Sequence, residues 1–391
     1  MDALELYDII TNGEDSFTEF KSDVSQRSDF AGEMIAFANV EGGQILVGVD
    51  DSGKILGVGD SSKVEEAIIS IARDNCKPPL TPLIDRVQTD QGLALVVRVP
   101  RRTGMPHENN SGQCYLRVGN TKRLASPQER ARLLQNAGMV HFDETPVLGT
   151  SFDDIDLPSF TTYYQSIYDQ PLENSDVPLQ QMLRNMRFLV EDLSGAERVS
   201  LAGILLFGKR PQDYLYYARI SAVRWDGGEA REKILDQKEI FGRLPEQIDE
   251  AVDFIIRNTR QSGAIEQPQQ VNVDEYPKAA LREVIVNAVA HRDYSLDGAQ
   301  ILLYVFDNRL EVRSPGVLPN SVTLENIRTH FSRPRNETIA RALLNLRYVN
   351  TLGSGVPRMI ALLKEHSKRE PDLELSSAQL LVRFWSKFVV Q

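Results

Sequence analysis

A carboxylate and a carboxamide lie four residues apart in the stretch LREVIVNAVAHRD, residues 281–293. The apolar residues of this stretch recur every three or four positions, which predicts one amphipathic helix. Residues four apart share a helix face, so Glu283 and Asn287 should point the same way. Glu283 could then orient a water molecule while Asn287 holds a hydrated Mg²⁺, as in a nucleotide site. Both side chains could equally coat a solvated face, and the spacing alone does not decide.

Two later stretches favour the nucleotide hypothesis. Residues 301–312 predict a β-hairpin, and it ends in the Gly/Pro turn SPGVLP at 314–319. Residues 352–359, LGSGVPRM, place Gly353 and Gly355 at the start of a predicted helix, where backbone N–H groups can approach a phosphate. A plain helix-start loop would also explain the glycines, but the order of helix, hairpin and glycine-rich helix start favours phosphate binding.

In this order the three motifs resemble the GHKL fold of gyrase, the large heat-shock chaperones, histidine kinases and MutL. They are most similar to the divergent GHKL-type, HATPase-like domain of a bacterial family of transcriptional regulators. The resemblance implies ATP binding, with Glu283 positioning the hydrolytic water, Asn287 ligating Mg²⁺, and Gly353 and Gly355 lining the phosphates. Ser314 stands where GHKL proteins usually carry the Asp that reads adenine, so adenine specificity and hydrolysis stay open.

The same resemblance adds further expected nucleotide contacts. Asp293 follows the predicted helix, and Gly316 lies in the Gly/Pro turn. Residues 323–349 would form the lid over the nucleotide. There, Arg333 and Arg335 could clamp phosphates or could simply be surface charges.

Three carboxylates near the N-terminus form a second candidate site. Glu14, Glu19 and Asp51, with Asp50 as an alternate, could together hold Mg²⁺ or Mn²⁺ and activate water for phosphodiester cleavage. Lys21 lies two residues beyond Glu19 and could neutralise a phosphate. Each acid could instead be solvated, because Asp50 and Asp51 suit a hairpin turn and Glu19 and Lys21 would share one face of a strand.

The stretches around these acids resemble, in order, the Schlafen-type AlbA-like domain. They are EDSFTEFK at 14–21, AFANVEGG at 36–43, GVDD at 48–51 and YLRVG at 115–119. The match covers roughly residues 10–140 and implies a nucleic-acid-binding fold. Several Schlafen members are metal-dependent endoribonucleases, whose three acids would fall on Glu14, Glu19 and Asp51. Many bacterial members share these acids and are known only as DNA-binding or regulatory, so the motif identifies the domain better than an activity.

Basic residues gather towards the end of this segment, namely Arg98, Arg101, Arg102, His107, Arg117, Lys122, Arg123, Arg130 and Arg132. We expect Arg117, Lys122 and Arg123, together with Lys21, to contact a nucleic-acid backbone through its phosphates. A solvated charged face is the other interpretation of this cluster.

Composition limits where such a protein works. The net charge is −11, which disfavours nonspecific coating of nucleic acid, so any nucleic-acid site must be a local basic patch. No apolar run approaches the roughly 20 residues that span a bilayer, so no membrane role is expected. The acidic N-terminus lacks a signal-peptide pattern, and the two isolated cysteines suit a reducing compartment. We therefore expect a cytoplasmic protein.

The 391 residues are enough for two or three domains of mixed α/β (α+β) class. We predict a Schlafen AlbA-like domain at 1–140. An acidic, Pro-containing linker and a connecting domain follow at 141–275, where oligomerisation is a plausible role. We predict a GHKL-like α/β sandwich at 276–391.

These features support one leading hypothesis and two alternatives. The leading hypothesis is a homo-oligomeric, nucleic-acid-binding protein controlled by ATP, with metal-dependent cleavage of RNA or DNA left open as an activity. Such a layout would suit a phage-defence effector. The alternatives are a non-enzymatic, DNA-binding transcriptional regulator and a GHKL ATPase that remodels a protein partner.

Overall fold

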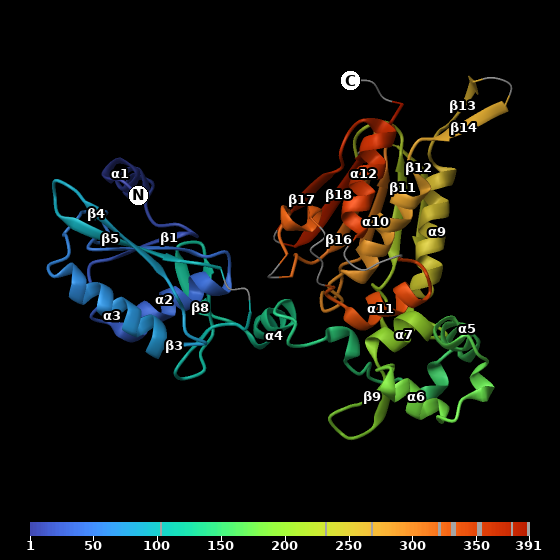
Figure 1. Cartoon of the computed structure of the whole chain (residues 1–391), viewed down its shortest axis with the longest axis horizontal. Helices are drawn as coiled ribbons and strands as arrows, with labels where there is room; N and C mark the ends of the chain where they lie inside the picture. Colours follow the sequence, from blue (N-terminus) through green and yellow to red (C-terminus); the bar gives the residue numbers. More distant parts are fainter. Residues whose placement is uncertain are drawn as a thin grey trace. The chain divides into compact units, whose positions relative to one another are not determined.

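The computed structural model describes residues 1–101, 104–230, 233–266, 269–319, 322–329, 334–349, 354–376 and 378–388 (Figure 1). The chain divides into two compact units, residues 1–140 and residues 141–391. Each unit combines helices with a β-sheet, which confirms the predicted mixed α/β class. None of the helices in the described ranges has the length and apolar character needed to cross a membrane.

Unit 1 is built around a four-stranded sheet. Its elements are α1 (Ala3–Asn12), β1 (Thr18–Lys21), α2 (Arg27–Asn39), β2 (Gly43–Val47), α3 (Ser61–Asp74), β3 (Cys76–Lys77), β4 (Leu83–Gln88), β5 (Leu93–Val99), β6 (Glu108–Asn109), β7 (Tyr115–Val118), β8 (Thr121–Leu124) and α4 (Pro127–Asn136). The strand order is β1-β2-β5-β4, in which β1 and β2 are parallel and the other pairs antiparallel.

Helix α2 is the central element of unit 1. Every residue from Phe30 to Asn39 is buried, so the helix has no solvated face over this length. Its apolar side chains join those of α3, β2 and β5 in one core cluster, and the β7–β8 hairpin also packs on α2. A helix in this position brings residues of β1 and β7 close to its own polar side chains.

Unit 2 is built around a six-stranded sheet. Its helices and turns are η1 (Phe142–Glu144), η2 (Phe152–Asp154), α5 (Leu157–Tyr168), η3 (Leu172–Asn174), α6 (Leu179–Asn185), α7 (Leu201–Phe207), α8 (Pro211–Tyr214), α9 (Leu244–Arg257), α10 (Lys278–Ala290), η4 (Asn326–Arg328), α11 (Glu337–Asn345) and α12 (Gly355–Ser367). Its strands are β9 (Leu189–Glu191), β10 (Glu197–Val199), β11 (Ile220–Trp225), β12 (Ile234–Ile240), β13 (Gln261–Glu266), β14 (Gln269–Asp274), β15 (Ile301–Val305), β16 (Arg309–Pro315), β17 (Asp372–Leu375) and β18 (Gln379–Trp385).

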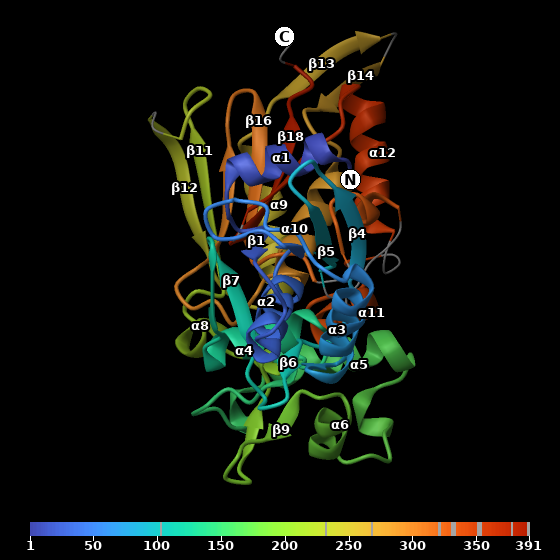
Figure 2. The ribbon, with the colours of Figure 1, turned by 90° about the vertical axis from the view of Figure 1, so that its left-hand side faces the viewer.

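The sheet of unit 2 has the order β12-β11-β15-β16-β18-β17, and only β11 and β15 are parallel. Helices α9, α10 and α12 cover one face of it (Figures 1 and 2). Alternate residues of β15 and β16 point into the core beneath these helices, while Glu311 on the opposite face pairs with Arg309, Arg313 and Arg383. This one-sided layering places α10 directly over the sheet.

The structure differs from the predicted organisation at residue 275. Strands β11 and β12 come from the segment that we expected to form a separate connecting domain. They extend the same sheet as β15 to β18, so no boundary between compact units falls there. The acidic stretch at 143–158, predicted as a linker, is also packed, because Asp143 is buried and Ile155 bridges to Gly208. Sheet pairing over a long sequence separation explains the first difference, and contacts of the acidic stretch with α11 and Gly208 explain the second.

We expect Gly43→Ala to destabilise unit 1. A Cβ at this position would lie 2.3 Å from Cδ1 of the buried Phe37 ring and 2.8 Å from the carbonyl oxygen of Phe17. Since this core is tightly packed, the clash should cost about 1–3 kcal/mol of unfolding free energy. Gly59→Ala is the control, because no heavy atom lies within 4 Å of its added Cβ. Calorimetric unfolding of the full chain measures both, and equal stability of the two variants would contradict the packing described.

Candidate functional site

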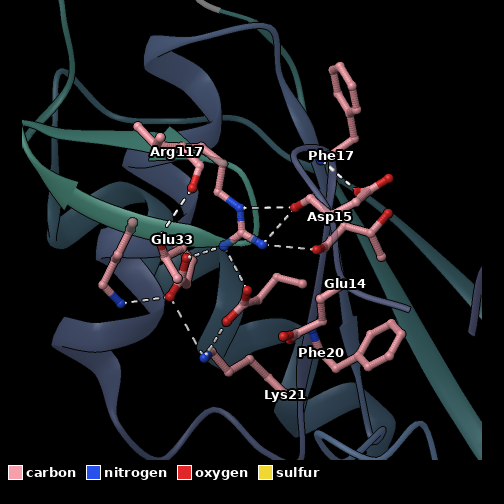
Figure 3. Close-up of polar contacts among 12 residues, drawn as sticks. Glu14, Asp15, Phe17, Phe20, Lys21, Glu33 and Arg117 are labelled. Atoms are coloured by element: carbon pink, nitrogen blue, oxygen red, sulfur yellow. Dashed lines mark hydrogen bonds and ion pairs between the residues drawn. The ribbon is translucent and has the colours of Figure 1, made fainter. Parts of the chain in front are cut away.

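Arg117 on β7 lies at the centre of an ionic cluster in unit 1 (Figure 3). Its side chain is only 1% exposed. Nη1 donates hydrogen bonds to Oε2 of Glu19 at 2.7 Å and to Oε2 of Glu33 at 3.2 Å. Nη2 donates to the carbonyl oxygens of Asp15 at 2.9 Å and Thr18 at 3.0 Å, and Nε donates to Asp15 at 3.3 Å. These contacts leave the guanidinium fully occupied inside the protein.

Two lysines and an aspartate complete the cluster. Lys21 Nζ lies 2.7 Å from Oε1 of Glu19 and 3.5 Å from Oδ2 of Asp29. Lys122 Nζ lies 2.7 Å from Oε1 of Glu33 and also pairs with Asp29. Three cations therefore face three carboxylates, and the cluster as a whole is neutral. Pairing of this kind offsets the cost of removing these charges from water.

The environment of Glu33 shifts its pKa upwards. Burial raises its pKa, the hydrogen bond from Lys122 opposes that rise, and the nearby charge of Glu19 adds to it. Burial alone would lower the pKa of Lys21. The hydrogen bond to Glu19 outweighs that effect, together with the neighbouring acidic charges, so the pKa of Lys21 is raised. The sequence analysis missed Glu33. Its signal was a single carboxylate within the apolar run of residues 30–38.

The structure does not bring Glu14, Glu19 and Asp51 together as a cation site. Within the described ranges, no group of three or more His, Cys, Asp or Glu side chains is arranged to hold a metal ion. Glu14 accepts a hydrogen bond from the backbone N–H of Phe20 at 2.9 Å, and Glu19 is occupied by cations. Asp51 lies exposed in the turn after β2. The expected assembly is therefore wrong, because the cations of the cluster take the oxygens of Glu19.

The four basic residues expected at a nucleic-acid surface have different environments. Arg117 is inaccessible, so its predicted phosphate contact is wrong. Lys21 and Lys122 are 25% and 18% exposed and are both paired within the cluster. Arg123 is 48% exposed and pairs with Glu129 at the start of α4. Among the other predicted basic residues, Arg98, Arg101 and Arg130 also have acidic partners, and Arg102 lies outside the described residues.

A second candidate site lies in unit 2, under α10. Glu283 and Asn287 share one face of this helix, as their spacing predicted, and Asn287 Nδ2 donates to Oε1 of Glu283 at 2.8 Å. Both side chains line a cavity that opens to solvent, and the space in the cavity together with the open solvent at its mouth is about 1270 Å³. The cavity also touches β16, β18, the start of α12 and the segment around Val322. A mostly apolar cavity with few polar groups is the usual form of a small-molecule site.

The Gly/Pro turn forms one wall of this cavity. Gly316 has a φ of +114°, and an added Cβ would lie 2.7 Å from Cβ of Asp293. The backbone N–H of Asp293 donates to the carbonyl of Pro315 at 2.8 Å, and Ser314 Oγ donates to the carbonyl of Ala288 at 2.8 Å. Only glycine satisfies both the backbone angle and the close approach. The turn therefore packs against the end of α10.

Asp293 and Arg335, both expected to contact the nucleotide, pair with each other instead. Their side chains are 7% and 1% exposed, with Oδ2 of Asp293 3.4 Å from Nη1 of Arg335. Arg335 also donates to the carbonyl of Val317. These contacts place the pair behind the lining residues Gly316 and Val317, where it supports the turn. Arg333 lies outside the described residues.

The N-terminus of α12 meets α10 at Gly355. An added Cβ there would lie 1.7 Å from Oε1 of Glu283, so the carboxylate packs directly on the glycine. Burial raises the pKa of Glu283, against the hydrogen bond from Asn287 and the charge of Arg358. The positive end of a helix dipole beside a carboxamide can hold a phosphate. Gly353, the other predicted phosphate-lining glycine, lies outside the described residues.

His291 also lines the cavity, at the end of α10. Burial lowers its pKa to about 4, and the charge of Arg335 acts in the same direction. The imidazole is therefore neutral near pH 7 and can offer one donor and one acceptor.

Comparison with known proteins finds family matches that contain the ionic cluster of unit 1 and part of the cavity lining of unit 2, although Glu283, Asn287 and His291 lie before the second match. Residues 14–126 match the family model described as "Schlafen, AlbA_2". Residues 298–384 match the model described as "Putative ATP-dependent DNA helicase recG C-terminal", which is of the HATPase type. Residues 131–220 match a domain of unknown function. The two outer matches confirm the resemblances seen in the sequence and indicate a nucleic-acid-associated protein.

Solved structures give weaker likenesses. The DIP2311 protein from Corynebacterium diphtheriae is 21% identical with a TM-score of 0.49, over 98% of this chain and 80% of that one. The N-terminal domain of a RecG-related protein from Nitrosomonas europaea is 26% identical with a TM-score of 0.26, over 32% of this chain and 90% of that one. Among curated proteins, none matches the chain.

We expect Arg117→Ala to unfold unit 1 rather than merely weaken nucleic-acid binding. The substitution leaves Glu19 and Glu33 buried without their shared cation, which should cost about 3–5 kcal/mol of unfolding free energy. Arg123→Ala is the control, because its exposed pair with Glu129 should leave stability almost unchanged. Calorimetry of the full chain reports both. A stable Arg117→Ala protein that has lost only nucleic-acid affinity would refute the structural role.

Proposed function

We propose that this protein binds nucleic acid through unit 1 and is controlled by a nucleoside triphosphate, ATP in the first instance, held with Mg²⁺ in the cavity of unit 2. One observation carries the nucleotide half of the proposal. Residues that the sequence separates by up to 72 positions, from Glu283 to Gly355, meet at one cavity together with Asn287 and Gly316. The N-terminus of α12 would face the phosphates there, and Asn287 would supply an oxygen ligand to Mg²⁺.

The groups that line the cavity can bind a nucleotide, but they do not select a particular base. Ser314 Oγ already donates to the carbonyl of Ala288, and the carboxylate of Asp293 is paired with Arg335. These two residues therefore offer the base neither a carboxylate nor a free hydroxyl at the Gly/Pro turn. His291 is a neutral polar group among the lining residues and is free of such an ion pair within the described residues. We therefore expect little preference for adenine over guanine.

The nucleic-acid half rests on the AlbA_2 match and on the exposed cations of unit 1. Residues 1–140 hold 15 Lys and Arg against 20 Asp and Glu, so the contact must be local. Metal-dependent cleavage would require Glu19 to leave Arg117 and Lys21, and the buried ion pairs oppose that step. A non-enzymatic regulator that binds DNA fits the same geometry without this rearrangement.

We expect Asn287→Ala to weaken Mg²⁺-ATP binding at least tenfold. The variant loses both the metal ligand and the hydrogen bond that orients Glu283. Isothermal titration of the full chain measures the affinity, and titration with GTP should give a value within about tenfold of that for ATP, or 1.4 kcal/mol. Asn345→Ala is the matched control, because Asn345 on α11 bonds Tyr163 away from the cavity lining. Equal affinities for wild type and Asn287→Ala would remove Asn287 from the site.

We expect labelled RNA or DNA to bind the full chain with a shallow dependence on salt, since few phosphates can be neutralised. Arg123→Ala should weaken binding several-fold. Arg86→Ala, whose side chain is 50% exposed and also paired with a glutamate, should not. Binding should persist in EDTA, because the carboxylates of the cluster are held by cations. Cleavage products that appear only with Mg²⁺ or Mn²⁺ would instead establish the nuclease and show that Glu19 changes partners.

A further inference from the structure

The carboxylate of Asp143 links the beginning of unit 2 to a helix nearly two hundred residues later. Asp143 lies on η1 and is 0% exposed. Its Oδ2 accepts hydrogen bonds from the backbone N–H groups of Thr338 at 2.8 Å and Ile339 at 3.1 Å, in the first turn of α11. Glu144 adds a contact, since its Oε1 accepts from Thr338 Oγ1 at 3.0 Å. A buried carboxylate on a helix N-terminus is a strong, charge-assisted cap.

The residues just before this turn reach the cavity wall. Asn336 is fully buried, and its Nδ2 donates to the carbonyls of Ala290 at 2.9 Å and Arg292 at 2.8 Å, at the end of α10. Arg335 pairs with Asp293 behind the Gly/Pro turn. Ala340, in the first turn of α11, lines the cavity itself. Residues 335–339, which we call the strap, therefore join the cavity wall to Asp143.

The other side of η1 is fixed to a different helix. The backbone N–H of Leu201, the first residue of α7, donates to the carbonyl of Thr145 at 2.9 Å, and Val147 bonds the carbonyl of Val199 at 2.9 Å. Because these hydrogen bonds fix Thr145 and Val147, a displacement of the strap should move little of the chain beyond Thr145. It would pass to residues 141 and 142, which are only half-buried and continue directly into unit 1.

We propose that the strap couples occupancy of the cavity to the segment by which unit 1 enters unit 2, with Asp143 as the positioning residue. A ligand that moves the end of α10 or the Gly/Pro turn also moves Asn336 and Arg335. The first turn of α11 must follow, and Asp143 must follow it, because separation would leave a buried carboxylate and two N–H groups unpaired. This inference rests on the proposed nucleotide site.

Hydrogen exchange followed by mass spectrometry on the full chain tests the coupling, with and without Mg²⁺-ATP. In the wild type, nucleotide should slow exchange both at 281–291 and at 141–145. Asp143→Ala should keep the first effect and lose the second, whereas Asp143→Asn keeps an acceptor oxygen and should retain at least part of it. Asp60→Ala is the matched control, since it removes an aspartate cap from α3 in unit 1 and should change neither effect.

The outcomes separate the coupling from the proposed function. Slower exchange at 281–291 with no change at 141–145 in the wild type would overturn the coupling and leave the nucleotide site standing. No slowing in any segment would count against the nucleotide site. The coupling is then tested by comparing wild type with Asp143→Ala in the absence of nucleotide. In that comparison, Asp143→Ala should speed exchange at 286–292 as well as at 338–341. Faster exchange confined to 338–341 would overturn the coupling on its own.

Discussion

A buried guanidinium neutralises a buried carboxylate in both units, and this constraint decides which residues remain available for chemistry. Arg117 holds Glu19 and Glu33 in unit 1, and Arg335 holds Asp293 in unit 2. An unpaired charge is costly to bury, and Glu19, Glu33 and Asp293 each meet that cost with a cation. Glu19 and Asp293 both looked like ligands in the sequence, and both are supports in the structure. Glu283 differs, because its half-buried side chain has a carboxamide as its hydrogen-bonding partner.

The parts that the sequence predicts well depend on local patterns. The amphipathic stretch at 281–293 appears as α10, Lys278–Ala290, and its four-residue spacing places Glu283 and Asn287 together as expected. The Gly/Pro turn follows the hairpin at the predicted place, and the backbone angle of Gly316 explains its glycine. Both features are set by residues within a few positions of one another, where periodicity and turn chemistry are informative.

The parts that the sequence did not predict depend on distant partners. Arg117 lies 98 residues from Glu19, and spacing cannot show that a cation so far away will occupy that carboxylate. The pairing of β11 with β15 likewise joins residues 81 positions apart, which is why the boundary expected at 275 falls inside a sheet. Asp143 lies in the acidic stretch that we predicted as a linker, and its burial depends on α11. In each case the deciding contact is tertiary and has no local signature.

The position of β18 also bears on how the chain is made. This strand, Gln379–Trp385, lies between β16 and β17, so the sheet of unit 2 cannot close until residues up to Trp385 have left the ribosome. Every strand of the unit 1 sheet, by contrast, is complete by Val99, and its ionic cluster is complete by Lys122. Unit 1 can therefore fold during translation while the beginning of unit 2 waits for its partners. During that interval Asp143 remains solvated and charged, and it is buried only when α11 emerges.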